Sequence, residues 1–480
     1  MKKFCILLSS AILIPYLAMA QNEVDVLRYS QLTFGGTSRS VAMGGAFGAL
    51  GADFSSLSIN PAGIGLYRKS EVSLTPGFFT QKTTSIYNGE TNYDSKPNFY
   101  FGNWGMVFNS KIGKDDDLPE WKSLSFGFGY NRTNDFNNRF LIQGTGNSSL
   151  LDVYLGNANG NIPDNLDPFS TQMAFQTYLL DTFPGYNNKY FTQVPFAGMH
   201  QRKAVTNSGG MGETVLSFGG NYSNQLFVGG TVGFSKVRYY ETSSYEETDE
   251  KDTILNIKSF KVSQDLSTLG NGYNVKFGMI YKPFDFVRIG AAIHSATYYT
   301  LTDTYNSSIT ANFDDGQTFS ANSPDGKYNY TMSTPFRAIG SLGFVIGKIA
   351  IIDADYEYVD YSSGRLRGSN YSFFNENDQV QKKYMATSNL RVGAEVKLSP
   401  ISLRVGYALY GSPYKGGVNF GTRSSYTGGF GFKGDSYFFD VAYVYSQHSE
   451  KYYIYSSKLV NATGNYFTSG SIQATIGFKF

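Results

Sequence analysis

The last ten residues of the chain, 471–480, read SIQATIGFKF, and their pattern decides the fold. Apolar side chains occupy every even position of this stretch: Ile472, Ala474, Ile476, Phe478 and Phe480. Since successive side chains of a β-strand point to opposite faces, one face of this strand is apolar and the other is polar. Strands of a membrane barrel alternate in this way, because one face contacts lipid and the other faces a polar lumen.

The same alternation recurs upstream, and the charged residues obey it. Six further segments alternate in this way: 287–293, 336–346, 350–358, 390–398, 401–409 and 437–445. Their charged residues all fall on the parity opposite to the apolar one. This segregation matters because an Arg or Lys facing lipid costs about 2–4 kcal/mol at the membrane midplane. Lys236 and Arg238 are the exception, since they share parity with Val232 and Phe234, and we expect them above the apolar band at the outer rim.

The alternating segments and the connections between them predict a barrel. About fourteen strands are expected, near residues 70–81, 97–110, 122–132, 213–222, 225–241, 258–281, 286–300, 327–347, 349–361, 384–398, 401–411, 424–433, 436–447 and 468–480. Tight turns alternate with long polar connections, as short periplasmic turns and long outer loops do in such barrels. We therefore predict an all-β protein, a transmembrane antiparallel β-barrel over 70–480 with a large extracellular loop at 133–212. A soluble β-sandwich array with alternating strands is the alternative.

The two ends of the chain predict its location. Residues 1–20 have the positive start, the short apolar core and the Ala-Met-Ala ending of a signal peptide, so the mature protein is expected to begin at Gln21. A terminal strand that ends on Phe480 also resembles the signal read by the outer-membrane barrel assembly machinery, a first expected partner. We therefore place the protein in the outer membrane of a Gram-negative type of cell, among outer-membrane lipid. An even number of strands puts both termini in the periplasm.

Composition excludes several classes of function. The chain has 40 basic and 38 acidic residues, and the signal peptide holds two of the lysines, so the mature chain is nearly neutral and no nucleic-acid partner is expected. The only cysteine, Cys5, lies in the signal peptide. Nucleophile elbows, metal-spaced histidines and phosphate-binding loops do not occur. We expect neither an enzyme, nor a cofactor, nor a metal site.

Residues 21–69, which precede the first strand, do not alternate. They are rich in Gly, Ala and Ser, which allow backbones to approach closely. A barrel of about fourteen strands encloses a lumen wider than its wall side chains fill. We therefore predict that this segment forms a hatch, or plug, inside the lumen.

The run SRSVAMGGAFGALGADFSSLSINPAGI, residues 38–64, resembles the hatch of the FadL/TodX family of outer-membrane transporters of hydrophobic compounds. The matching positions are Gly44, Gly45, Asp53, Asn60, Pro61 and Ala62. The resemblance spans the mature chain and implies a fourteen-stranded barrel around a hatch. It also implies passive uptake of hydrophobic small molecules such as long-chain fatty acids. In fatty-acid members the exit is a lateral opening beside a kinked strand, and we identify no such kink in this sequence.

Two other functions occur among relatives of this kind. Some act as partners of other proteins in type IX secretion and transport nothing. Others carry a haemin-receptor label, although only His200, His294 and His448 are present here, widely separated and without an axial-ligand pattern. An apolar pocket leading from the loops to the hatch would favour transport, whereas a large partner-binding loop surface would favour the secretion role.

Two sets of residues are candidates for contact with a ligand. A fatty acid needs a cation for its carboxylate. Four arginines of lumen parity are available for this: Arg288, Arg337, Arg391 and Arg404. Pairing with the lumen acids is the favoured alternative, and those acids are Asp353, Asp355, Glu357, Glu395 and Asp440. Apolar side chains of loop 133–212 are candidates for an entrance groove: Leu150, Leu151, Tyr154, Met173, Phe175, Tyr178 and Leu179. An equal alternative is that these side chains only hold the loop together.

Overall fold

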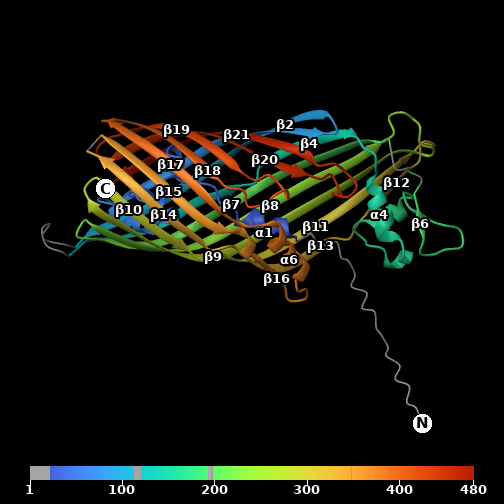
Figure 1. The fold of residues 1–480 in the computed structure, drawn as a ribbon, viewed down its shortest axis with the longest axis horizontal. Helices are drawn as coiled ribbons and strands as arrows, with labels where there is room; N and C mark the ends of the chain where they lie inside the picture. Colours follow the sequence, from blue (N-terminus) through green and yellow to red (C-terminus); the bar gives the residue numbers. More distant parts are fainter. Residues whose placement is uncertain (1–21, 113–119, 193, 195–197, 348) are drawn as a thin grey trace, which may run out of the picture.

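The barrel is closed, as the alternation predicts. The computed structural model describes residues 22–112, 120–192, 194, 198–347 and 349–480, so the signal peptide lies outside the described residues. Neighbouring strands pair antiparallel around a ring of 14, and β1 (Glu71–Tyr87) closes it by pairing with both β2 (Glu90–Lys111) and β21 (Thr463–Lys479). Figure 1 shows the tilted strands and the C-terminus at one rim.

Eleven further strands complete the ring: β3 (Trp121–Asp135), β7 (His200–Tyr222), β8 (Leu226–Thr248), β9 (Ile257–Phe284), β10 (Val287–His294), β14 (Arg337–Ile346), β15 (Ala350–Asp360), β17 (Ala386–Leu398), β18 (Ile401–Tyr410), β19 (Arg423–Lys433) and β20 (Tyr437–Tyr452). Outward continuations and short strands lie beyond them: β4 (Asn138–Thr145), β5 (Asp181–Thr182), β6 (Tyr190–Phe191), β11 (Tyr298–Phe313), β12 (Thr318–Asn322), β13 (Gly326–Ser333) and β16 (Arg365–Arg367). All fourteen expected strands are present, but several expected loops are strand. β11, for example, continues over residues 301–313, which were expected as loop, and β9 has 28 residues, whereas a tilted membrane strand needs about 9–11.

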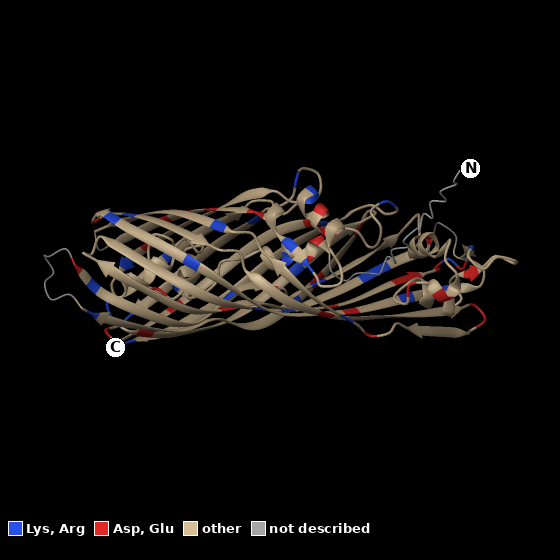
Figure 2. Ribbon diagram, turned by 90° about the horizontal axis from the view of Figure 1, so that it is seen from below, with Lys and Arg blue, Asp and Glu red and all other residues tan. Residues whose placement is uncertain are grey.

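The outer wall carries the apolar surface that lipid contact requires. Large side chains of the expected lipid-facing parity are exposed, for example Phe277 at 59% and Val405 at 62%. On β21 the outward face carries Ile472, Ile476 and Phe478, each about half exposed. Figure 2 shows long stretches of strand without charged residues and a concentration of charge in the outermost loops. The parity argument therefore holds around the ring.

The segment before β1 lies inside the barrel. It forms α1 (Glu23–Ser30), α2 (Ser38–Ala42), α3 (Ser56–Ile59) and the 3-10 helix η1 (Pro61–Leu66). Its apolar side chains are buried against the wall, since Ala62 packs with Phe227 and Ile280. α1 lies beside α6 (Phe374–Lys383), far from the rim that holds the C-terminus (Figure 1). That both termini face the periplasm remains a prediction.

A separate layer, which we call the cap, covers the end of the barrel opposite the C-terminus (Figure 1). It consists of the described residues between 146 and 199, with α4 (Leu150–Ala158), η2 (Pro163–Asn165) and α5 (Thr171–Gln176), packed on the outer ends of β4, β8, β9 and β11. A third 3-10 turn, η3 (Tyr361–Ser363), joins β15 to β16. The cap has its own apolar core, in which Leu151 and Met173 pack with Val262 and Ile309. No described helix has the length and apolar character that crossing a membrane would require.

Candidate functional site: three linked cavities above the hatch

The Asn-Pro-Ala motif fastens the hatch to the wall. The Asn60 side chain accepts a hydrogen bond from the Ala62 backbone N–H at 3.1 Å and donates to the Gly48 carbonyl at 2.7 Å. The same amide donates to the Met279 carbonyl on β9 at 3.2 Å. Pro61 is the first residue of η1, a position at which a backbone N–H would have no acceptor within the helix. The missing N–H of proline therefore costs no hydrogen bond there. This motif therefore shapes the hatch and ties it to the barrel.

The other hatch-motif residues are structural as well. Asp53 is buried and accepts hydrogen bonds from the Thr37 hydroxyl at 2.7 and 2.8 Å and from the Ser55 N–H at 2.9 Å. Gly44 and Gly45 have φ of +67° and +74°, a conformation that side chains disfavour. A Cβ on Gly44 would also lie 3.0 Å from the backbone of Tyr407. These residues fix how the hatch is folded and seated.

Wall carboxylates hold the hatch backbone from the other side. Asp355, on β15, accepts hydrogen bonds from the N–H groups of Phe47 at 3.1 Å and Gly48 at 3.0 Å. Glu395, on β17, pairs with the hatch residue Arg39 at 3.0 Å. Because hydrogen bonds to ionised groups are stronger than neutral ones, these contacts hold the hatch firmly inside the barrel.

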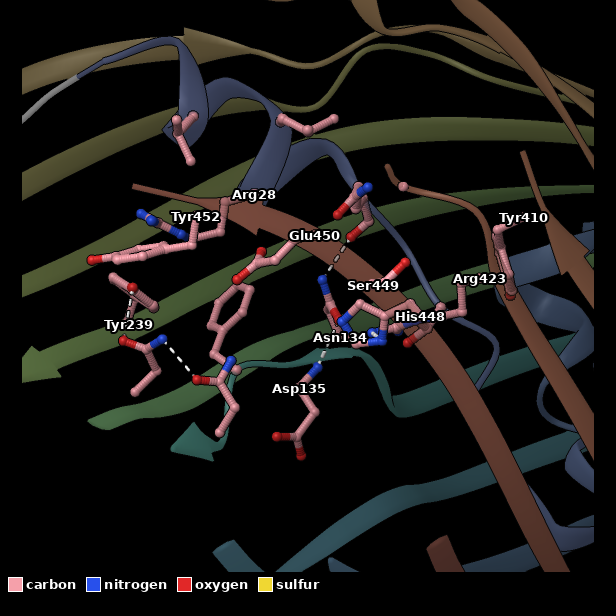
Figure 3. A pocket seen from close by; sticks show the side chains of 18 of the residues that line it. Arg28, Asn134, Asp135, Tyr239, Tyr410, Arg423, His448, Ser449, Glu450 and Tyr452 are labelled. Atoms are coloured by element: carbon pink, nitrogen blue, oxygen red, sulfur yellow. Dashed lines mark hydrogen bonds between the residues drawn. The ribbon is translucent and has the colours of Figure 1, made fainter. Parts of the chain in front are cut away.

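A cavity of about 300 Å³ lies above the hatch, between α1 and the outer halves of β18–β20. Its walls mix apolar and aromatic side chains, including Leu27, Phe136, Tyr410 and Tyr452, with a few charged groups. Figure 3 shows Arg423 and His448 side by side at one end of this central cavity, with Glu450 and Arg28 further along. Small-molecule sites combine apolar surface with placed polar groups, and this cavity has both, with about half of its lining residues polar.

Arg423 is the cation best placed to meet a ligand. Its guanidinium lies 3.4 Å from Nδ1 of His448 and makes no ion pair with any described residue. The His448 ring is in turn stacked on Phe467, with ring centroids 4.7 Å apart. The other arginine of the cavity, Arg28, is already paired with Asp25 and lies over the Tyr239 ring. An anionic group in this cavity would therefore be drawn to Arg423.

A second cavity of about 120 Å³ adjoins the first and shares Arg423, Tyr410 and Asn134 with it. It lies between the hatch and the wall formed by β1, β2 and β19–β21, and hydroxyl side chains line much of it. These are Ser425, Ser446, Ser469 and Ser471. Tyr100, Gly102 and Arg132 line its other side.

The wall beside the second cavity contains a break in strand pairing. β2 pairs with β3 only from Asn103, opposite Asn131, to the inner rim, and its outer half pairs with β1 alone. β3 shifts register against β7 between Arg132 and Asn134. The side chains of Arg132 and Tyr100 occupy the break, and the Arg132 guanidinium lies 5.1 Å from the centroid of the Tyr100 ring.

A third cavity, of about 380 Å³, lies under the cap, and Glu241 lines both it and the central cavity. Two residues of the expected entrance groove, Leu150 and Tyr154, line it. Lys203 is 8% exposed there, donates to the Ser243 hydroxyl at 3.2 Å, and has a lowered pKa because burial disfavours its charge. The cap cavity, the central cavity and the second cavity thus form a chain with shared lining residues.

Comparison with known proteins agrees with this architecture. No protein-family model and no curated protein matches the chain. Solved structures do match, among them a Pseudomonas aeruginosa FadL homologue, with TM-score 0.55, 12% identity, and 94% of this chain and 99% of that chain covered. The chain has the FadL-type fold. The Pseudomonas putida toluene transporter TodX is also similar, with TM-score 0.52 and 13% identity over 93% of this chain and 99% of that one.

The four arginines chosen from the sequence occupy other parts of this FadL-type barrel. Arg404 pairs with Glu395 and Asp440, each at 2.6 Å. Arg391 and Arg337 both pair with Glu357. Pairing with lumen acids, the alternative interpretation, therefore describes three of the four arginines. Arg288 makes no ion pair with a described residue, but it lines none of the three cavities.

The remaining groove candidates serve mainly as core of the FadL-type barrel's cap. Leu151, Met173 and Leu179 are buried in it, and Phe175 packs against it. Tyr178 is 56% exposed, with its ring 4.7 Å from that of Phe319. The interpretation that these side chains hold the loop together therefore describes most of the set.

Sequence reasoning missed Arg423 and the break beside Arg132. Arg423 begins a strand at the edge of an expected loop, so its position facing the lumen was not visible. A signal for the break is present in the polar run Asn131–Asp135, where lipid-facing alternation stops. The three histidines lie apart: His294 contacts the Ile59 carbonyl, His200 lies 3.5 Å from Glu250, and only His448 lines the central cavity. Within the described part of the chain, no group of three or more His, Cys, Asp or Glu side chains is arranged to hold a metal.

Proposed function

We propose that this protein is an outer-membrane channel through which hydrophobic small molecules, such as long-chain fatty acids, pass without energy coupling. The observation that carries the proposal is the chain of three cavities, which runs from the cap to the wall beside the hatch. The fold supports it, since one similar structure is a toluene transporter.

The ligand enters under the cap and rests in the central cavity. Its chain lies against Leu27, Phe136 and Tyr452, and its anionic group lies at Arg423. The acids of the lining support this orientation, because Glu241 and Glu450 line the central cavity but not the second one, and Asp135, which lines both, pairs with Arg132. Arg423 is half-buried and has no ion-pair partner among the described residues, so a bound carboxylate would stabilise it.

The ligand leaves sideways through the break between β2 and β3, and the hatch remains seated. Two observations support this route. The second cavity reaches the break, and the side chains of Tyr100 and Arg132 lie in it. The hatch below is fastened by Asn60 and Asp355, so a route through it would require those bonds to break.

The test blocks the second cavity and leaves the central one intact. A Cβ on Gly102 would lie 3.3 Å from the Gly36 carbonyl oxygen of the hatch and 3.4 Å from the Gln473 amide oxygen, so Gly102→Leu fills the mouth of this cavity. We expect the variant to bind tritiated oleate like wild type but to lose most oleate uptake in a host lacking its own uptake protein. Gly340→Leu is the matched control, since that glycine is exposed on the outer wall with nothing within 4 Å of its Cβ.

Uptake by Gly102→Leu equal to that of wild type would contradict the lateral route. Lack of oleate binding by the wild type itself would contradict the transport proposal. It would favour the role in type IX secretion, which requires none of these cavities. Both variants must show the heat-dependent gel mobility of a folded barrel before the comparison is made.

A further inference from the structure

Lys236 and Arg238 lie on the outer wall of the barrel and do not face the lumen. Both are exposed and point outward from β8, between the lipid-facing Phe234 and Tyr240. Tyrosines of this kind mark the headgroup level of a membrane, where a cation costs only about 0–1 kcal/mol. The position is therefore tolerated, but tolerance does not explain why two like charges stand two residues apart.

The acids near this pair are engaged with other cations, since Asp135, which lies opposite Gly210, pairs with Arg132. Neither residue makes an ion pair within the described chain. Lys236 lies between Gly212 on β7 and Asn271 on β9, and Arg238 lies between Gly210 and Leu269. The acid nearest in sequence on β7, Glu213, is buried in the lumen and paired with Lys276. The two cations are thus left for a partner outside the protein.

Neighbouring side chains cover the surface beside the pair. Gly210 and Gly212 carry no side chain of their own, and the Tyr130 hydroxyl and an Arg132 nitrogen lie 2.0 Å and 2.9 Å from the Cβ positions of Gly212 and Gly210. A guanidinium and an ammonium two residues apart on the same face of a strand suit a phosphate, which Arg can bind through two parallel hydrogen bonds.

We propose that Lys236 and Arg238 bind the phosphate group of an outer-leaflet lipid on the outside of the barrel. Basic residues at a membrane surface attract anionic headgroups. Together, the two residues should strengthen lipid binding about 30-fold. The site lies at the same height as the break in pairing next to Arg132. The proposed site lies on the outside of the wall, so lipid binding there does not depend on which molecule the lumen carries.

The test compares lipid binding to the delipidated protein by native mass spectrometry. The probe is diphosphoryl lipid A, with its dephosphorylated form as the uncharged comparison. We expect K236Q/R238Q to bind the phosphorylated lipid about 30-fold more weakly than wild type does. The control K258Q/K261Q removes two other exposed charges, at the outer end of β9, and is expected to bind like wild type.

Two results would overturn the proposal. One is unchanged binding of the phosphorylated lipid by K236Q/R238Q. The other is an equal loss for the dephosphorylated lipid, which would show that the residues act through packing rather than charge. Because oleate binding is measured separately, failure of this site is distinguishable from failure of the transport proposal.

Discussion

Removing the carboxylate of Asp355 should unseat the hatch. This side chain is fully buried on β15 and accepts hydrogen bonds from the backbone of Phe47 and Gly48 at 3.1 and 3.0 Å. In Asp355→Ala both N–H groups lose their acceptor. Arg391, 3.6 Å from Asp355, keeps its bond to Glu357 at 3.1 Å, so the barrel network itself survives.

The size of the expected effect on hatch seating follows from these two hydrogen bonds. A hydrogen bond to a charged group contributes about 1.5–3 kcal/mol, and water entering the vacated space recovers part of it. A net loss of about 3 kcal/mol raises the ratio of displaced to seated hatch by about 100-fold. We expect frequent large-conductance openings in planar lipid bilayers, where the wild type stays closed.

Asp360→Ala is the control for this experiment. It removes the same charge from the end of the same strand, but Asp360 bonds only to the nearby turn, through Ser362. A folded Asp355→Ala barrel that conducts no more than this control would refute the role assigned to the wall carboxylates.

Two further predictions concern the ligand and the cap. Arg423→Gln should weaken oleate binding by about 10-fold or more, because a charge-assisted bond is lost, while 1-octadecanol binding stays unchanged; equal losses for both ligands would contradict the anchoring role. Burial raises the pKa of Glu247, which lies in the cap beyond the apolar band, from 4.5 to about 7. Since its neutral form is favoured in the folded state, cap stability should be greatest below pH 4.5 and fall by about 3 kcal/mol as the pH rises through 7. Calorimetry at pH 5 and pH 8 should show this difference, and Glu247→Gln should abolish it; a wild-type cap equally stable at both pH values would contradict the assignment.

The ring of strands could be predicted from the sequence because lipid imposes a strict rule on each one. On the wall around Val405 and Ile472, a charge would be unfavourable, so alternation is visible residue by residue. Outside the membrane that rule ends. The outer part of β11 carries Thr and Asn on its exposed face, and it looked like a loop although it is a paired strand.

The candidate site was less accessible to sequence reasoning. Parity places Arg391 on the lumen side, whereas Arg423 lies at the edge of an expected loop, and parity says nothing of which acids lie across the barrel. Arg391 pairs with Glu357, whereas Arg423 contacts His448 and makes no ion pair with a described residue. Such cross-lumen contacts depend on the closed ring and on where the hatch lies. The hatch motif was found because its local turn chemistry, at Asn60 and Pro61, is visible in a short stretch.

The most direct test of the account is to identify what the purified protein carries. The barrel should be isolated in mild detergent, and its co-purifying small molecules analysed by mass spectrometry before and after exchange with tritiated oleate. The account predicts a hydrophobic molecule in stoichiometric amount, displaced by oleate and bound more weakly by Arg423→Gln. An empty barrel that does not take up oleate and instead co-purifies with secretion components would contradict it.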